Sequence, residues 1–252
     1  MATDRMSIMS HLQEFRKRVV LSAAGILFGS IGGWVAYGTL IKSLSKPVCG
    51  VENKIADCNT LYISGVLGPL NLQIKIALLV GVILSAPFWL YQLWAFVAPG
   101  LHKKEKKWSI LFIIAATPFF ATGVTLGYYI LPLAIKVLLG FTPSSLDNLI
   151  KFDDYLDFVV RIMLIFGLAF ELPVFLVALN IAGVLTGKGI LKPWRASVFG
   201  IFLFTAVFTP TGDPITMLAL AMPLCGLYFM AGGISLLNDR RRNRKKSQSE
   251  EE

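Results

Sequence analysis

The fold class is decided by residues 158–185, which read FVVRIMLIFGLAFELPVFLVALNIAGVL. This run contains two charged side chains, Arg161 and Glu171, and its apolar residues are continuous rather than restricted to one helical face. An apolar run longer than about 18 residues is typical of a helix that crosses a membrane. We therefore interpret this segment as a transmembrane helix that has Glu171 near its middle.

The whole chain has the composition of a membrane protein. Of its 252 residues, 55% are hydrophobic and 15% are charged, whereas soluble globular proteins average about 25% charged residues. The same apolar excess excludes intrinsic disorder. Further apolar runs predict five more spans, at residues 19–41, 70–97, 108–139, 196–208 and 215–237. We expect an all-α, polytopic integral membrane protein with six transmembrane helices.

Two of these runs depart from the length of an ordinary span. Residues 108–139 are more than a bilayer core of about 30 Å requires, so Pro118 and Pro132 are expected to kink or end that helix. Residues 196–208 correspond to only about 20 Å of helix. This short run either thins the bilayer locally or forms a re-entrant hairpin with the sixth run.

The distribution of charge predicts the topology. The formal net charge is +9, and 17 of the 24 Lys and Arg residues lie in segments that six spans place on one side. Because basic residues beside spans collect on the cytoplasmic side, both termini are expected in the cytoplasm. The chain then divides into a cytoplasmic N-terminal segment (1–18), a six-helix transmembrane domain (19–237) and a disordered, charged cytoplasmic tail (238–252).

The cysteines and histidines limit the possible chemistry. Cys49 and Cys58 share one extracytoplasmic loop, where they either form a disulfide or remain two free thiols. Cys225 is expected to pack inside the sixth span. His11 and His102 lie on the opposite side of the membrane, and no nucleotide-binding, metalloprotease or hydrolase motif is present. We therefore expect no enzyme, no cofactor, no metal site and no nucleic-acid partner.

Three carboxylates stand in unusual places. Glu171 near the bilayer midplane must face the protein interior or a wet cavity, or be protonated, because an unpaired charge there costs at least about 2.5–3.5 kcal/mol. It either makes a hydrogen bond between helices or forms part of a path for a substrate or partner. Glu14 and Glu105 are almost the only acids on the basic face, and aromatic side chains accompany both: Phe15, Trp94, Phe96 and Trp108.

Glu14 and Glu105 suit a ligand that carries paired guanidinium groups followed by a hydrophobic stretch, because arginine binds carboxylates bidentately. A simpler interpretation also stands. Glu14 can pair with Arg18 four residues later in an interfacial helix, and the lysines around Glu105 can attract anionic lipid head groups.

Several motifs occur together, in order and at specific spacings. They are HLQEFRKR at 11–18, GP at 68–69 followed by Lys75, SAP at 85–87, YQLWAFVAPGL at 91–101 followed by Glu105, FGLAFELP at 166–173 and FTPTGDP at 208–214. With these motifs the chain resembles the TatC family of the twin-arginine protein translocase over about residues 7–237. The loop with paired cysteines and the TGDP turn are most similar to actinobacterial members.

The resemblance implies a concave six-helix bundle in the cytoplasmic membrane of a bacterium. Such a protein binds twin-arginine signal peptides and organises the export of folded proteins with TatA and TatB-type single-span subunits. It also associates with itself, and the proton-motive force drives transport. Partner subunits are expected to dock along the fifth and sixth helices.

The resemblance also assigns roles to residues. Glu14 and Glu105 would bind the arginine pair of the signal, and Arg16, Arg18 and Phe96 would support that site. Glu171 would be the polar group of the membrane pocket, and Asp213 the acid of the last extracytoplasmic turn. The chain departs from the family pattern at Phe15, where Leu is usual, and at Met217 and Phe229, where polar residues are usual.

Two other functions remain open from the residues alone. A proton-coupled secondary transporter would use Glu171 as a proton or substrate relay. A purely structural membrane scaffold would depend on none of these carboxylates.

Overall fold

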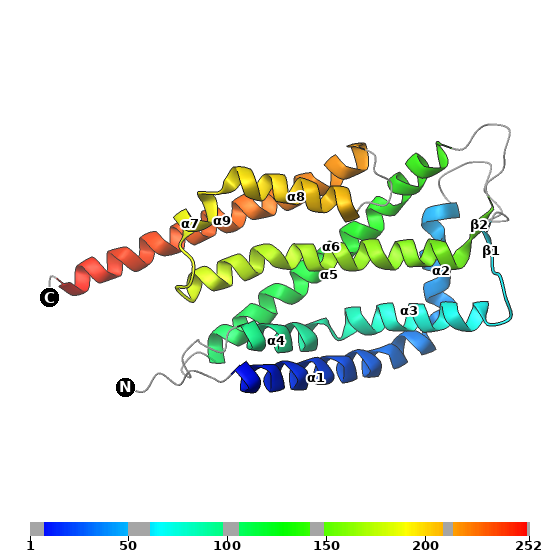
Figure 1. The fold of residues 1–252 in the computed structure, drawn as a ribbon, viewed down its shortest axis with the longest axis horizontal. Helices are drawn as coiled ribbons and strands as arrows, with labels where there is room; N and C mark the ends of the chain where they lie inside the picture. Colours follow the sequence, from blue (N-terminus) through cyan, green and yellow to red (C-terminus); the bar gives the residue numbers. More distant parts are fainter. Residues whose placement is uncertain (1–7, 50–60, 98–105, 142–148, 209–213, 251–252) are drawn as a thin grey trace. The chain divides into compact units, whose positions relative to one another are not determined.

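The computed structural model describes residues 8–49, 61–97, 106–141, 149–208 and 214–250. Within these ranges the chain is almost entirely helical, with nine helices and two strands of two residues each (Figure 1). It forms two compact units. Unit 1 comprises Met1–Leu44 and Ile63–Pro118, and unit 2 comprises Ser45–Tyr62 and Phe119–Glu252.

Unit 1 is built on the packing of α1 (Ile8–Val35) against α3 (Gly68–Leu84) and α4 (Ala86–Val97). Glycines make this packing close. A Cβ atom on Gly29 would lie 2.9 Å from the carbonyl oxygen of Gly81, and one on Gly33 would lie 2.8 Å from the Cα of Ala77. Small residues at four-residue spacing let helix backbones approach closely in membrane proteins.

The predicted span at 70–97 is a bent pair of helices. Helices α3 and α4 meet at Ser85 with a bend of 62°. Pro87 stands in the first turn of α4, where its missing N–H removes no helical hydrogen bond. Across the bend, Trp89 Nε1 donates a 2.9 Å hydrogen bond to the Val82 carbonyl. The indole thus satisfies a carbonyl near the end of α3.

The predicted span at 19–41 ends earlier than its hydropathy suggests. Helix α1 stops at Val35, and α2 (Tyr37–Cys49) starts after a turn at Ala36. The sequence becomes amphipathic at this point, because α2 buries Leu44 and Val48 but exposes Lys42 and Lys46.

Unit 2 is built around α9 (Pro214–Glu250), which contacts α6 (Phe152–Ile181), α7 (Gly187–Leu191) and α8 (Trp194–Phe208). The second half of α5 (Lys106–Leu139) meets α6 at a pair of glycines. A Cβ atom on Gly123 would lie 2.5 Å from the Phe166 carbonyl oxygen and 3.0 Å from the Cα of Gly167. Gly123 cannot carry a side chain without separating the two helices, and a Cβ atom on Gly167 would meet the side chains of Phe120 and Val124.

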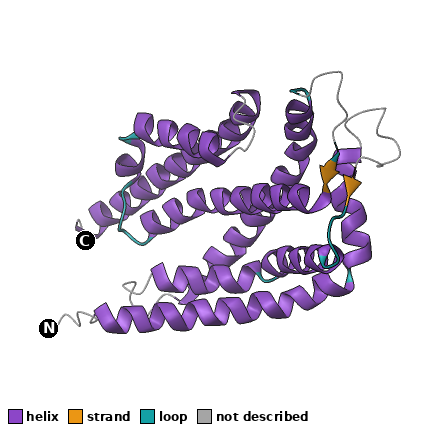
Figure 2. Cartoon of the chain, turned by 45° about the vertical axis from the view of Figure 1, so that its right-hand side comes forward, coloured by secondary structure: helices purple, strands orange, loops and turns teal. Residues whose placement is uncertain are grey.

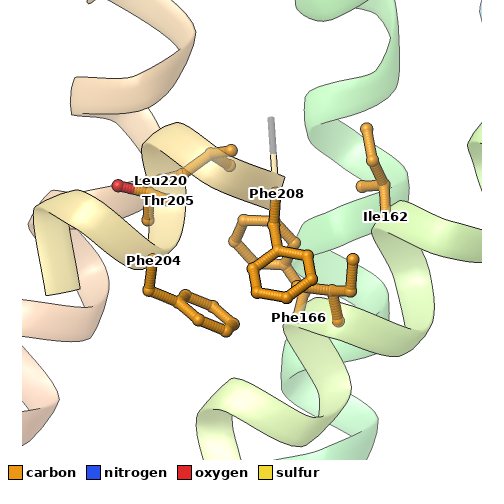
Figure 3. Close-up of a pocket in the computed structure, with 7 residues that line it drawn as sticks. Ile162, Phe166, Phe204, Thr205, Phe208 and Leu220 are labelled. Carbon is orange, nitrogen blue, oxygen red and sulfur yellow. The ribbon is translucent and has the colours of Figure 1, made fainter. Parts of the chain in front are cut away.

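Aromatic side chains join α8 to α6 within unit 2. Phe204 and Phe208 have ring centroids 4.6 Å apart, and both line a cavity of about 10 Å³ with Ile162 and Phe166 of α6 (Figure 3). A space of this size holds at most about one water molecule. At the end of α8, Phe204 and Phe208 therefore lie beside Phe166 of α6.

Two short strands pair with each other, and they belong to two loops that the predicted topology places on the same side of the membrane. Strand β1 (Leu61–Tyr62) precedes α3, and β2 (Ile150–Lys151) immediately precedes α6. They pair in parallel, with Leu61 opposite Ile150 and Tyr62 opposite Lys151 (Figure 2). This pairing requires both loops to lie on one side, in agreement with the charge distribution. The sequence interpretation contained no strands.

Four described helices are long and apolar enough to span a membrane: α1, α5, α6 and α9. The bent α3–α4 pair makes a fifth candidate, and α8 is a shorter apolar helix. The six spans predicted from the sequence correspond to these four helices, the α3–α4 pair and α8. Helix α8 has 15 residues, which correspond to about 22 Å of helix.

The structure bears on two expectations about helix ends. Pro118 and Pro132 are expected to kink or end a helix; α5 ends at neither but continues to Leu139, because proline is tolerated within membrane helices when the freed backbone groups find other partners. The tail from residue 238 was expected to be disordered, but α9 continues to Glu250. After Gly233 this segment contains no glycine or proline, and it is rich in Arg and Lys, which favour helix.

Candidate functional site

The N-terminal part of α1 carries a carboxylate that holds a guanidinium group. Arg18 donates to Glu14 Oε1 through Nη2 at 2.6 Å and through Nε at 3.0 Å. Both side chains are about three-quarters buried, with 23% of Arg18 and 27% of Glu14 exposed. Both bonds end on Oε1, so Oε2 accepts no hydrogen bond from the described residues.

The same arginine connects α1 to α4. Its Nη1 donates a 3.3 Å hydrogen bond to Gln92 Oε1, and only 8% of Gln92 is exposed. Beside this bond, the rings of Phe15 and Phe96 lie 5.0 Å apart at 53°. Polar and aromatic contacts thus fix the position of α1 against α4 next to Glu14.

An apolar groove leads away from this cluster. It has a volume of about 350 Å³ and lies between α1 and α4. Its lining is formed by Phe15, Arg18, Val19, Ser22, Ala23, Ile26, Trp89, Gln92, Leu93 and Phe96. Two polar residues of this lining, Arg18 and Gln92, are joined by a side-chain hydrogen bond. The groove therefore begins beside the Glu14–Arg18 pair and has a mainly apolar lining.

Trp94 anchors the end of α4 nearby. It is 3% exposed and stacks on Phe112 of α5, with ring centroids 4.3 Å apart and planes at 15°. Both residues belong to unit 1. The stack holds the end of α4 against the first part of α5.

Not all predicted site residues are described. Glu105, Asp213 and Cys58 lie outside the described residues, and so does the side chain of Cys49, so the question of a disulfide stays open. Arg16 is described and exposed on α1. Two positions from Glu14, it lies on another face of the helix.

Glu171 lies inside unit 2, where α6 packs on α5. It is 2% exposed and stands one helical turn after Gly167, the glycine that contacts Phe120 and Val124 of α5. Among the described residues neither carboxyl oxygen makes a hydrogen bond, although the backbone of Phe120 is close enough to interact electrostatically. Glu171 lines neither the groove beside Glu14 nor the cavity at Phe204.

The chemistry of this region suits a guanidinium group beside an apolar segment. Carboxylates bind guanidinium groups strongly, as Glu14 does with Arg18, and the neighbouring groove has a mainly apolar lining. Sequence reasoning found Glu14, Arg18 and Phe96 but gave no role to Gln92, although it lies within the quoted run at 91–101.

The comparisons with known proteins agree on a single family. Residues 10–223 match the model of the Sec-independent protein translocase protein (TatC) family. The chain is 39% identical to the Sec-independent protein translocase protein TatC of Xylanimonas cellulosilytica, over 96% of this chain and 87% of that protein. It is 37% identical to the TatC of Frankia casuarinae, over 94% of this chain and 68% of that protein.

Solved structures give the same result. A crystal structure of the twin arginine translocase receptor TatC in DDM superposes with a TM-score of 0.74 at 31% identity. The match covers 89% of this chain and 99% of the other. On the family match over most of the chain and on these relatives, the protein belongs to the TatC family of Sec-independent protein translocase proteins.

Proposed function

We propose that this chain is the receptor of its translocase for twin-arginine signal peptides, and that Glu14 binds one arginine of the signal. Membership of the family makes the chain a multi-pass protein of the bacterial cytoplasmic membrane and a transport protein rather than an enzyme. Its cargo is folded proteins, and the proton-motive force supplies the energy.

The observation that carries this proposal is the bond between Glu14 and Arg18 at the end of an apolar groove. A signal guanidinium binds Oε2 of Glu14 or replaces Arg18 on Oε1. The apolar stretch that follows in the signal then lies along the groove between α1 and α4. Glu105, which directly precedes α5 in the sequence, binds the second arginine.

Partner subunits form the second part of the proposal. TatA and TatB-type single-span helices dock on the exposed apolar faces of α8 and α9, which include Phe199, Leu203, Met222 and Met230. Phe229 on α9 is 44% exposed and lies 6.5 Å from Trp194 between ring centroids. A partner helix therefore meets an aromatic surface at this position, where other family members have a polar one.

The experiment is photocrosslinking of a twin-arginine peptide from positions 14 and 105 of the full chain in membranes. Glu14→Gln combined with Glu105→Gln should reduce binding of this peptide by about tenfold or more, because two charged hydrogen-bonding partners are lost. A peptide with two lysines in place of the arginines should crosslink weakly to the unaltered chain.

A matched control removes one carboxylate charge elsewhere. Asp154→Asn alters an exposed acid at the start of α6 and should leave crosslinking unchanged. If the double variant inserts normally into membranes and crosslinks like the unaltered chain, Glu14 and Glu105 are not the arginine site.

A further inference from the structure

A second and larger groove lies in unit 2. It has a volume of about 670 Å³ between α6 and α8. One wall is a stripe on α6 from Ala169 to Leu179, and the other is a stripe of residues at the start of α8 and along it: Pro193, Ser197, Gly200, Ile201 and Phe204. Leu172 on the first wall is 58% exposed, so the groove is open along its side.

The groove has the length of one membrane leaflet. From Pro193 to Phe204 a helix rises about 16 Å, which is half of a hydrocarbon core of about 30 Å. Phe204 also lines the small cavity beside Phe166, so the aromatic side chains of Phe204 and Phe166 lie at this end of the groove. An occupant enters from the side or from the end near Pro193.

The interior of the groove is suited to hydrocarbon. Its lining is apolar apart from Ser197 and Tyr228, and the Tyr228 hydroxyl already donates a 2.5 Å hydrogen bond to the Ile190 carbonyl. A buried hydroxyl that is satisfied in this way requires no polar ligand. Hydrocarbon therefore fits along the whole length of the groove.

The end near Pro193 is basic. Lys188, Lys192 and Arg195 are all exposed. Lys188 and Lys192 directly precede the groove-lining residues Gly189 and Pro193, and Arg195 stands two residues after Pro193. The guanidinium of Arg195 lies 5.5 Å from the ring centroid of Trp194. Exposed tryptophan and basic residues together are typical of the level of lipid head groups. The topology places this end on the cytoplasmic side, where anionic lipids attract such clusters.

We propose that the groove between α6 and α8 holds one acyl chain of an anionic phospholipid, whose head group is bound by Lys188, Lys192 and Arg195. The basic end near Pro193 favours this occupant over an uncharged apolar helix, because anionic head groups are attracted to clusters of basic residues. The bound lipid fills the space between α6 and α8 and becomes part of the packing of unit 2.

The test measures lipid retained by the purified full chain in native mass spectrometry. The chain is first exchanged into either phosphatidylglycerol or phosphatidylcholine with identical acyl chains. Gly200→Leu places a side chain in the groove, and no atom lies within 4 Å of the position of its Cβ, so the backbone can carry the substitution without a clash at Cβ. This variant should retain either lipid about tenfold less well, because the apolar site is lost.

Gly226→Leu is the matched control. Gly226 lies on α9, also has open space around the position of its Cβ, and does not line the groove. It should retain lipid like the unaltered chain. If Gly200→Leu and Gly226→Leu retain the same amount of lipid, the groove does not hold an acyl chain.

A second variant tests the head group without altering the packing. Combining Lys188→Gln, Lys192→Gln and Arg195→Gln should remove a preference of about tenfold or more for phosphatidylglycerol over phosphatidylcholine. The control removes three other basic charges, with Lys46→Gln, Lys136→Gln and Arg161→Gln, and should keep the preference. An unchanged preference in the first triple variant overturns the head-group assignment. If Gly200→Leu prevents association of a single-span partner while lipid retention is normal, a partner helix and not a lipid occupies the groove.

Discussion

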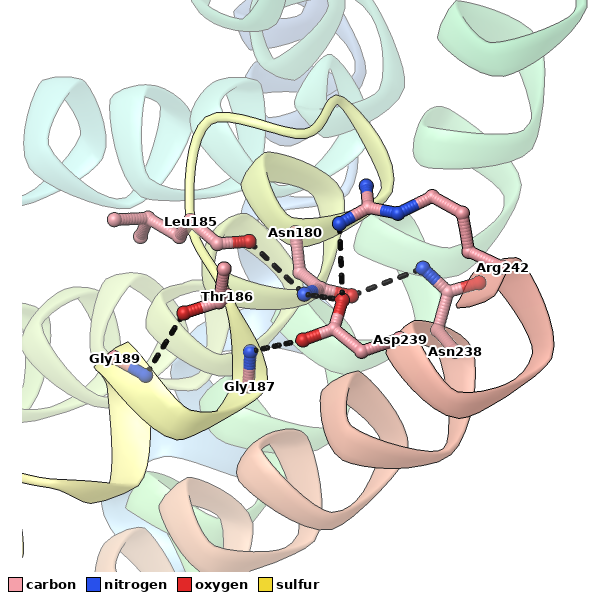
Figure 4. Close-up of polar contacts among 8 residues, drawn as sticks. All are labelled: Asn180, Leu185, Thr186, Gly187, Gly189, Asn238, Asp239 and Arg242. Atoms are coloured by element: carbon pink, nitrogen blue, oxygen red, sulfur yellow. Dashed lines mark hydrogen bonds and ion pairs between the residues drawn. The ribbon is translucent and has the colours of Figure 1, made fainter. Parts of the chain in front are cut away.

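The carboxylate of Asp239 on α9 accepts a 2.7 Å hydrogen bond from the main-chain nitrogen of Gly187, the first residue of α7 (Figure 4). Its other oxygen accepts a 2.9 Å bond from Asn180 near the end of α6 and lies 3.4 Å from Nη2 of Arg242. Asn180 is fully buried. One carboxylate therefore connects α6, α7 and α9.

Replacement of Asp239 should destabilise unit 2. Asp239→Ala leaves the Gly187 amide without its side-chain acceptor and removes one of the two acceptors of Asn180 Nδ2, which keeps its bond to the Leu185 carbonyl. Each unsatisfied buried group costs about 1–3 kcal/mol. We expect a clear decrease in the midpoint of thermal unfolding in detergent. Arg240→Ala, at the neighbouring exposed position, is the control and should change the midpoint little. Equal midpoints for the two variants would show that the Asp239 contacts contribute no stability.

Enlarging Gly29 should separate α1 from α3 in unit 1. The Cβ of any larger residue would lie 2.9 Å from the Gly81 carbonyl oxygen, and backbone cannot move away as a flexible side chain can. Overpacking of this kind costs about 1–3 kcal/mol, so Gly29→Leu should lower the unfolding midpoint. Gly38→Leu is the control, since no atom lies within 4 Å of the position of its Cβ. A Gly29→Leu variant as stable as Gly38→Leu would contradict this close helix packing.

The sequence predicts where the helices lie but not where they bend or end. Long apolar runs predict helix because unsatisfied backbone groups are too costly in a bilayer. The bend at Ser85 depends on how Trp89 reaches back to Val82, which hydropathy does not encode. The helical tail after Leu237 was missed because charge was taken as a sign of disorder, although its arginines and lysines favour helix.

The contacts of the candidate site could be predicted where they join residues close together in the sequence. Glu14 and Arg18 are four residues apart, so helical periodicity alone brings them together. Gln92 is 74 positions from Arg18, and their contact depends on the tertiary packing of α1 on α4. The close approach of helices at Gly29 could have been predicted from the sequence, because Gly25, Gly29 and Gly33 repeat at four-residue spacing.

The bond between Glu14 and Arg18 should matter more for recognition than for stability. Because about a quarter of each side chain is exposed, solvent screens the pair, and such pairs contribute about 0–1 kcal/mol. A double-mutant cycle of Glu14→Gln and Arg18→Gln, followed by thermal unfolding, should give a coupling energy below about 1 kcal/mol that decreases with added salt. A coupling energy of several kcal/mol would make the pair a structural element instead.

The buried carboxyl group of Glu171 should lower the free energy of unfolding of the protein. It is 2% exposed, and its carboxyl oxygens make no hydrogen bond within the described residues. Burial of an unsatisfied polar group is unfavourable, so Glu171→Met, of similar length and apolar, should raise the unfolding midpoint by a few degrees, corresponding to about 1–2 kcal/mol.

Two further variants make the Glu171 test specific. Glu171→Gln keeps the shape and polarity of the side chain and should unfold close to the midpoint of the unaltered chain. Leu172→Met is the control for the introduction of methionine at the next position, which is 58% exposed, and should have little effect. A lower midpoint for Glu171→Met than for Leu172→Met would mean that the carboxyl group stabilises the contact between α5 and α6. Glu171 would then be a structural element of unit 2.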